Sequence, residues 1–311
     1  MSAVDTPVAT PVPLSRDERR ALVQESARSG YRRRAWLSRL FMTALVASIL
    51  LTFIPLFAIV TSVVGKGWRF VSWTFITTPQ LQAGILSKNI GGISNAITGS
   101  LLIDGLALIM VVPLSIALSI AFYETNNWFM ATFRRIVEVM VGLPSILFGL
   151  FVFAFVVTPM GYQYTGLAGS IALALLMLPV MTVANEAALR AVPQTLIEAG
   201  LALGSRKSRI MWRVILPYAF PRMLTGMLLS LSRAVGETAP VLLIINSSLV
   251  TNWNPMSPQT TLPLLIYNNL SSFNPVVIDS DWGIALILIV AVFLINLSSR
   301  LIVARSQKGR S

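Results

Sequence analysis

The sequence predicts an all-α integral membrane protein with six transmembrane helices. Of its 311 residues, 55% are hydrophobic and 12% are charged, whereas soluble domains carry about 25% charged residues. The mean hydropathy of +0.75 excludes a soluble globular enzyme. Six apolar stretches are each long enough to supply the ~20 residues of a membrane-crossing helix, the form that satisfies the backbone of such a segment in lipid. These stretches are residues 36–64, 95–123, 136–158, 167–188, 223–247 and 282–303.

The basic residues predict how these helices are oriented. Twenty of the 24 Lys and Arg residues lie in the N-terminal segment, the second and fourth connections and the C-terminal end. These four segments share one side of the membrane, and basic residues concentrate on the cytoplasmic side. We therefore expect both termini and the fourth connection, residues 185–222, in the cytoplasm. The net charge of +12 then reflects topology and contact with membrane lipid, and not nucleic-acid binding.

Composition along the chain divides it into three parts. Residues 1–35 contain Pro7, Pro11 and Pro13, many charges and few large apolar side chains, which predicts a disordered basic tail in the cytoplasm. Residues 36–303 form the transmembrane domain, and residues 304–311 form a short cytoplasmic tail.

The chain lacks the residue types on which most catalysis depends. It has no Cys and no His, so it has no thiolate nucleophile or cysteine metal site and no imidazole base. It also has no paired catalytic carboxylates. An intramembrane enzyme is therefore the class of function that we expect least, and no metal site is predicted.

The fourth connection is patterned as two short helices on the membrane surface. Pro193 fits the first position of a helix, Gly204 fits its left-handed end, and Ser205 fits the cap of a second helix. The second helix is predicted to expose an apolar face ringed by Arg and Lys. Such a face either rests on anionic lipid or inserts into a groove of a partner protein. Its residues are Ile210, Met211, Val214 and Ile215.

A long motif in this connection resembles a known signature. It consists of Glu198-Ala199-Gly200, three residues, Gly204, nine residues, and Val214-Ile215-Leu216-Pro217. The motif resembles the EAA signature of ABC importer permeases, which reads E-A-A, three, G, nine, I, one, L-P, with Gly200 and Val214 as conservative departures. The resemblance implies a type I ABC importer permease arrangement in which this loop docks on a dimer of ATP-binding cassette ATPases. The docking residues would be Glu198, Ala199, Gly200, Gly204, Leu216 and Pro217.

A second motif narrows the resemblance. Residues 233–240 read Arg-Ala-Val-Gly-Glu-Thr-Ala-Pro, which is similar to the R-A-x-G-E-T-A-P run of phosphate permeases, and supporting segments extend the likeness over about residues 90–300. The Ala-Pro after Glu-Thr points to the PstA-type subunit. The resemblance implies a PstC-type second permease as partner and a phosphate-binding protein outside the membrane. The chain has no G-x-x-x-x-G-K-[ST] run, so ATP and Mg²⁺ would bind the separate ATPase and this chain would bind no cofactor.

Three ionisable residues fall inside the predicted spans. Arg233 lies eleven residues beyond Arg222, about 16 Å along a helix and near the midplane, and Glu237 lies one turn further on the same face. Asp104 is predicted at a comparable depth. An ionised group there costs about 2.5–3.5 kcal/mol, so the three are candidates for a substrate pathway. The alternative is an Arg233–Glu237 pair that only fixes helix packing. For Asp104 a structural role, as a partner of Arg233 or as a polar group, is the favoured interpretation.

These observations leave more than one function open. The main prediction is a permease subunit that moves inorganic phosphate across the bacterial cytoplasmic (inner) membrane by alternating access, because a guanidinium fork suits a phosphoryl group. A permease for sulfate or molybdate is the nearest alternative. A membrane scaffold or sensor that binds a cytoplasmic partner is the other, although it gives no reason to bury charges in lipid.

Overall fold

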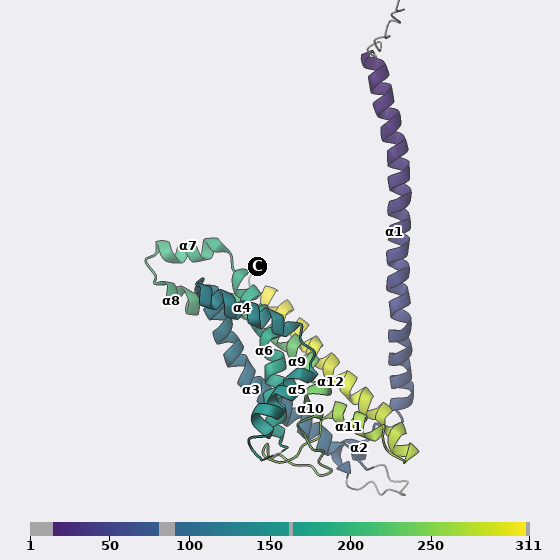
Figure 1. Ribbon diagram of the computed structural model, residues 1–311, viewed down its shortest axis with the longest axis vertical. Helices are drawn as coiled ribbons and strands as arrows, with labels where there is room; N and C mark the ends of the chain where they lie inside the picture. The colour runs from purple at the N-terminus through teal and green to yellow at the C-terminus, as the bar shows by residue number, and fades with distance from the viewer. Residues whose placement is uncertain (1–14, 81–90, 162–163, 309–311) are drawn as a thin grey trace, which may run out of the picture. The chain divides into compact units, whose positions relative to one another are not determined.

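The computed structural model describes residues 15–80, 91–161 and 164–308, and the regular structure within these ranges is helical, as the sequence predicts (Figure 1). The chain divides into two units, Met1–Thr61 and Ser62–Ser311, which are described separately. Five helices of the described residues are long and apolar enough to cross a membrane, or six if one bent pair counts as a span. All-α membrane architecture is therefore confirmed.

The first helix begins earlier than its apolar stretch. Helix α1 runs from Arg16 to Gly67, so residues 16–35 are helical and differ from the tail that we expected there. A capping box explains the early start, because the Ser15 hydroxyl accepts from the amide of Glu18 while the Glu18 carboxylate accepts from the amide of Ser15. Residues 1–14 of the predicted tail lie outside the described residues.

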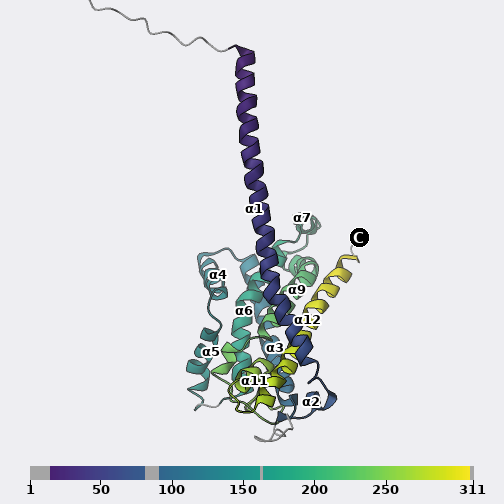
Figure 2. The ribbon, with the colours of Figure 1, turned by 90° about the vertical axis from the view of Figure 1, so that its right-hand side faces the viewer.

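The second unit is a bundle with α6 at its centre. Helix α6 (Gly166–Arg190) packs against α3 (Ser94–Glu124) on one side and α9 (Leu216–Ala234) on another, and α12 (Pro275–Lys308) packs on α9 (Figure 2). The short helices α2 (Trp73–Thr77) and α11 (Leu262–Asn269) pack against α3. Together α3, α6 and α12 confirm the second, fourth and sixth predicted spans, with ends shifted by a few residues.

The third predicted span is bent. Helix α4 covers Trp128–Val141, α5 covers Ile146–Val152, and a π-helical segment, η2, continues over Phe153–Val157. The two parts meet at 116° across residues 142–145, so residues 136–158 do not form one continuous helix. Pro144 has no amide hydrogen and its ring excludes the preceding turn, and Gly142 is a weak helix former. Apolar residues continue on both sides of the bend, so apolar length alone does not show it.

The fifth predicted span is shifted and interrupted. The helical segment begins at α8 (Lys207–Ile210), continues through η3 (Met211–Ile215) into α9, and ends at Ala234. A separate short helix, α10, covers Ala239–Leu242. The expectation of one helix over residues 223–247 was therefore wrong. The interruption falls on the motif that carries Arg233 and Glu237.

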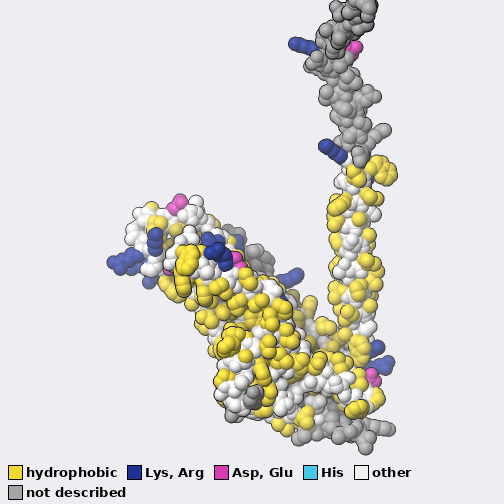
Figure 3. Space-filling model, viewed as in Figure 1, with side chains coloured by type: hydrophobic (Ala, Val, Ile, Leu, Met, Phe, Trp, Pro, Cys, Tyr) yellow, Lys and Arg dark blue, Asp and Glu magenta, His cyan; other side chains and the backbone are white. Residues whose placement is uncertain are grey.

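Charge is distributed unevenly over this second unit. Lys and Arg side chains gather at the end that carries α7 (Gln194–Ala202) and α8, whereas hydrophobic side chains cover the middle of the bundle (Figure 3). We call this the basic end. The segregation is what the distribution of basic residues along the sequence predicts.

Candidate functional site

The loop at the basic end is two helices joined at a left-handed glycine. Gly204 has a φ of +74°, as predicted. The amide of Gly204 donates to the carbonyl of Leu201, and that of Ser205 to the carbonyl of Gly200, which is the Schellman pattern that ends a helix. Ser205 is thus part of the first helix end, and Arg206 occupies the N-cap of α8. Pro193 is likewise the N-cap of α7 rather than its first residue.

The apolar face of the second helix points inward, which corrects our expectation that it is exposed. Ile210, Met211 and Ile215 are almost fully buried against the bundle, and Val214 is half-buried. A Cβ added at Gly200 would lie 3.1 Å from Cδ1 of Ile210, so α7 and α8 are closely packed. The amphipathic pattern located the apolar face correctly but could not tell which surface covers it.

The exposed surface of the loop is instead formed by α7. None of its residues is buried, and Leu196, Leu201 and Leu203 are exposed, Leu203 by 86%. The predicted docking residues Glu198 and Ala199 lie on this helix and are exposed. The remaining predicted docking residues, Leu216 and Pro217, lie at the beginning of α9. Large apolar side chains exposed beyond the spans mark a surface for a partner.

A groove separates this loop from the end of α3. It has a volume of about 840 Å³, and Tyr123, Thr125, Arg190, Gln194 and Lys207 are among the residues that line it. The groove lets α7 stand away from the bundle. The loop is attached at its start, where Nη1 of Arg222 donates to the carbonyl of Ala191 over 3.2 Å.

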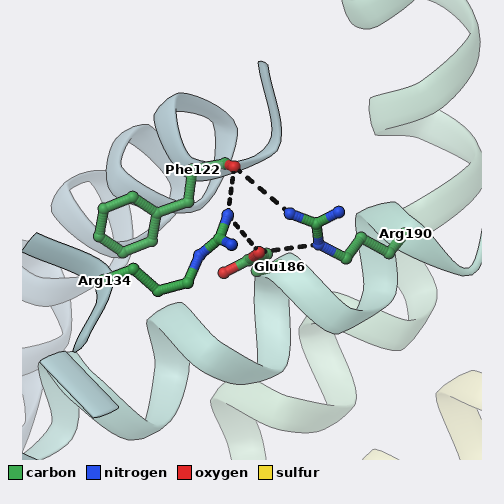
Figure 4. A network of polar contacts seen from close by, with 4 residues as sticks. All are labelled: Phe122, Arg134, Glu186 and Arg190. Atoms are coloured by element: carbon green, nitrogen blue, oxygen red, sulfur yellow. Dashed lines mark hydrogen bonds and ion pairs between the residues drawn. The ribbon is translucent and has the colours of Figure 1, made fainter. Parts of the chain in front are cut away.

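Beside the groove, two arginines converge on one carboxylate. Nη2 of Arg134 and Nε of Arg190 each lie 2.8 Å from Oε1 of Glu186, and the Glu186 side chain is only 11% exposed (Figure 4). Both guanidiniums also donate to the carbonyl of Phe122, in the last turn of α3. We call these four residues the arginine clamp. It ties the last turns of α3 and α6 to the middle of α4 at the basic end.

The predicted intramembrane pair lies where the fifth span is interrupted. Nε of Arg233 is 3.5 Å from Oε1 of Glu237, with side chains 54% and 19% exposed. The pair exists as predicted, but it does not lie on a continuous helix. The amides of Gly236 and Glu237 donate to the carbonyls of Arg233 and Ala234, three residues back, and this tighter turn keeps the two side chains together. We call residues 233–240 the charged break.

The charged break is seated on α5 by a glycine. A Cβ added at Gly149 would collide with the carbonyl oxygen of Pro240, so the backbone of α10 rests directly on α5. Pro240 stands near the N-terminus of α10, where its missing amide hydrogen costs nothing. The charged break is therefore held in place by direct backbone contact with α5.

Asp104 is buried in α3 but is not joined to the charged break. Its side chain makes no ion pair or hydrogen bond with Arg233 or Glu237 in the described part of the chain. The partnership with Arg233 that we considered for Asp104 is thus not formed. A second carboxylate, Asp281, is buried in α12 and accepts from Nδ2 of Asn269 over 2.7 Å.

Sequence reasoning missed the arginine clamp. Glu186 and Arg190 are spaced four residues apart near the end of a predicted span, a spacing that places them on one helix face. The sequence therefore contains a signal for the Glu186–Arg190 contact. It contains no signal for the contact with Arg134, which comes from a different helix, fifty-two residues before Glu186 in the chain.

The second unit is an apolar helical bundle with charges at an interrupted span and an exposed two-helix loop at its basic end, as expected of a polytopic membrane transport permease. The chain belongs to the family of binding-protein-dependent transport system inner membrane components, whose model matches residues 112–311.

Relatives of similar length support this assignment. The chain is 36% identical over 262 residues to phosphate transport system permease protein PstA 1 of Mycobacterium tuberculosis (strain ATCC 25618 / H37Rv), covering 84% of this chain and 85% of the relative. It is 33% identical to the PstA protein of Yersinia pestis, covering 92% and 97%. It is 36% identical to a probable PstA protein of Methanocaldococcus jannaschii, covering 82% and 89%.

Two solved structures share the fold. A bacterial alginate ABC transporter superposes with a TM-score of 0.62 at 17% identity, covering 87% of this chain and 96% of that chain. The MetNI methionine ABC transporter superposes with a TM-score of 0.55 at 20% identity, covering 68% and 94%. Both are ABC transporters, and their likeness confirms the expected fold, the type I ABC importer permease arrangement.

Proposed function

We propose that this chain is the membrane-spanning permease subunit of an ATP-driven importer that moves inorganic phosphate across the cytoplasmic membrane by alternating access. The observation that carries the proposal is its identity of 33–36% with phosphate permeases from two bacteria and an archaeon over most of its length. No feature of the chain favours sulfate, molybdate or a role as a scaffold over phosphate.

Arg233 is the residue that we assign to the substrate pathway. Its side chain is 54% exposed within this chain, and a guanidinium in lipid costs about 2.5–3.5 kcal/mol. The surface around it therefore faces water or a partner subunit. A guanidinium offers a planar fork to two phosphate oxygens, and Glu237 supplies an acceptor for a proton on phosphate. Asp104 is assigned to the wall of the same pathway, without contact to the pair.

The source of energy is a separate polypeptide. The exposed face of α7, with Glu198, Ala199 and the turn at Gly204, docks on a dimer of ATP-binding cassette ATPases, which bind ATP and Mg²⁺. A PstC-type permease completes the pathway beside Arg233, and a phosphate-binding protein delivers the substrate from outside. The basic end and both termini face the cytoplasm, as the distribution of Lys and Arg favours.

Reconstitution tests the proposal directly. The chain is expressed with its companion subunits, purified as a complex and placed in liposomes, and ATP-dependent uptake of labelled phosphate, sulfate and molybdate is measured. We expect phosphate uptake to exceed that of the other two anions by at least about tenfold, the discrimination that one unmatched buried polar group provides. Equal uptake of sulfate contradicts the assigned substrate, and no ATP-dependent uptake of any anion contradicts the transport function.

A further inference from the structure

The arginine clamp lies at the start of the docking loop and joins the last turns of α3 and α6 to the middle of α4. Arg190 is the last residue of α6 and lines the groove beneath α7. Its Nε reaches Glu186, while its Nη2 reaches the carbonyl of Phe122 over 3.5 Å. The planar guanidinium fork fixes both directions at once. A displacement at the start of the loop therefore acts on α6 and α3 together.

Glu186 passes the same displacement to α4. Its Oε1 accepts from Arg134 as well as from Arg190, both at 2.8 Å, and the Arg134 guanidinium also lies 5.6 Å from the centre of the Phe122 ring. A carboxylate with 11% exposure that lies between two guanidiniums is held strongly, because removing it leaves both positive charges facing each other. Glu186 is thus the central residue of the clamp.

From α4 a short path leads to the charged break. Helix α4 is followed, after residues 142–145, by α5. Gly149 of α5 lies against the backbone of Pro240, three residues after Glu237. All of these contacts lie within the unit Ser62–Ser311. The path connects the groove below α7 with the Arg233–Glu237 pair through one ion-pair network, one bent helix pair and one backbone contact.

We propose that Glu186 is a positioning residue that couples movement of the docking loop to the charged break, by holding Arg190 and Arg134 as one rigid unit. The proposal rests on the proposed function, since it assigns the loop to an ATPase and the break to the substrate. Glu186 itself is assigned no contact with the ATPase or with the substrate. It acts through Arg190 on one side and through Arg134 and α4 on the other.

Substitution of Glu186 by Gln keeps the size of the side chain and removes its charge. We expect the reconstituted complex of Glu186→Gln to assemble and to hydrolyse ATP at no less than half the wild-type rate, while phosphate transported per ATP hydrolysed falls at least tenfold. Arg190→Lys keeps the charge but loses the fork, so we expect an intermediate fall in the same ratio. Glu138→Gln, an exposed position on α4, is the matched control and should leave the ratio unchanged.

A distance measurement separates coupling from simple stability. The chain has no Cys, so spin labels are attached at Trp128→Cys on α4 and Ala191→Cys at the start of the loop. In the wild-type background we expect a single distance between the two spin labels, unchanged through the ATP cycle, because the residues of the arginine clamp move together. In the Glu186→Gln background the distance should broaden or shift when ATP is added.

These outcomes decide the proposal. An unchanged ratio of transport to hydrolysis in Glu186→Gln overturns it, as does a wild-type label distance that changes during the cycle. If Glu186→Gln fails to assemble, Arg190→Lys decides by the same ratio. If the wild-type complex does not transport phosphate, the proposed function fails, while the label distances still decide the clamp.

Discussion

The two charged sites of this chain are built from the same residue types but are held very differently. In the arginine clamp, Oε1 of Glu186 lies 2.8 Å from both guanidiniums; the side chain of Glu186 is 11% exposed, and those of Arg134 and Arg190 are 27% and 51% exposed. In the charged break, Arg233 and Glu237 stand 3.5 Å apart and the arginine is half-exposed. Removing one partner of a fully buried pair costs about 3–5 kcal/mol, whereas an exposed pair contributes about 0–1 kcal/mol. The Arg134–Glu186 contact, which is shorter and less exposed than the Arg233–Glu237 pair, lies nearer the first of these limits.

The difference between the two sites indicates which of them can bind a ligand. Arg134 and Arg190 already donate to a carboxylate and to a helix-terminal carbonyl, which leaves fewer of their donors for an arriving anion. Arg233 has one distant carboxylate as its partner among the described residues. Most of its donors remain available. The clamp is suited to transmit force, and the break is suited to exchange a substrate.

The largest expected effect comes from Arg233→Gln. Loss of a charge-assisted hydrogen bond of about 3 kcal/mol corresponds to roughly a 100-fold fall in phosphate uptake, because no other cation of the break replaces it. Uptake into proteoliposomes at equal protein amounts measures the effect. Wild-type levels of uptake would show that Arg233 is structural and would remove the contrast between the two sites.

Disruption of the docking loop should have the next largest effect. Gly204→Pro cannot adopt the left-handed conformation at +74°, and Glu198→Lys reverses the charge of the exposed face. We expect either change to lower uptake at least about tenfold and to reduce copurification of the ATPase in parallel, since a misplaced interface residue costs about 1–3 kcal/mol. Membrane insertion should be normal, as shown by protein level. Full copurification together with full uptake would contradict the docking assignment.

Gly149→Ala tests whether the charged break depends on the close contact between Gly149 and the backbone of Pro240. The added methyl group collides with the backbone of Pro240, and such overpacking costs about 1–3 kcal/mol. We expect a lower midpoint of thermal unfolding in detergent and a several-fold loss of uptake. Gly105→Ala, also in a spanning helix but with open space around the new methyl group, is the control. An equal response of both variants would show that the contact with Pro240 has no special role.

The smallest expected effect on phosphate comes from Glu237→Gln. The pair is loose, so phosphate uptake should fall by no more than about fivefold, the equivalent of about 1 kcal/mol. Sulfate has no proton to share with a carboxylate, and its exclusion should relax when Glu237 is neutralised. Substrate is loaded directly so that the external binding protein does not filter it. If the uptake of phosphate and the uptake of sulfate fall equally, the only role of Glu237 is to neutralise Arg233.

The parts of this chain that sequence predicts best are those governed by a local rule. Apolar length located the second, fourth and sixth spans, and a Schellman glycine located the turn at Gly204. The parts that it predicts poorly depend on a long-range partner. Residues 142–145 and 235–238 interrupt longer apolar stretches, so apolar length alone does not show the bend at the first segment or the break at the second. The burial of Ile210 and the meeting of Arg134 with Glu186 depend on which helices become neighbours.

The exposed guanidinium of Arg233 also bears on how the cell assembles this subunit. An orphan copy in the bilayer has a half-exposed arginine at a spanning helix, and a cost of about 2.5–3.5 kcal/mol is comparable to much of the stability of a small fold. Its folded population is then set by the supply of whatever covers that surface. This subunit therefore persists in the membrane only when its partner subunits are made in matching amounts. Surplus copies of the chain become targets for membrane proteases.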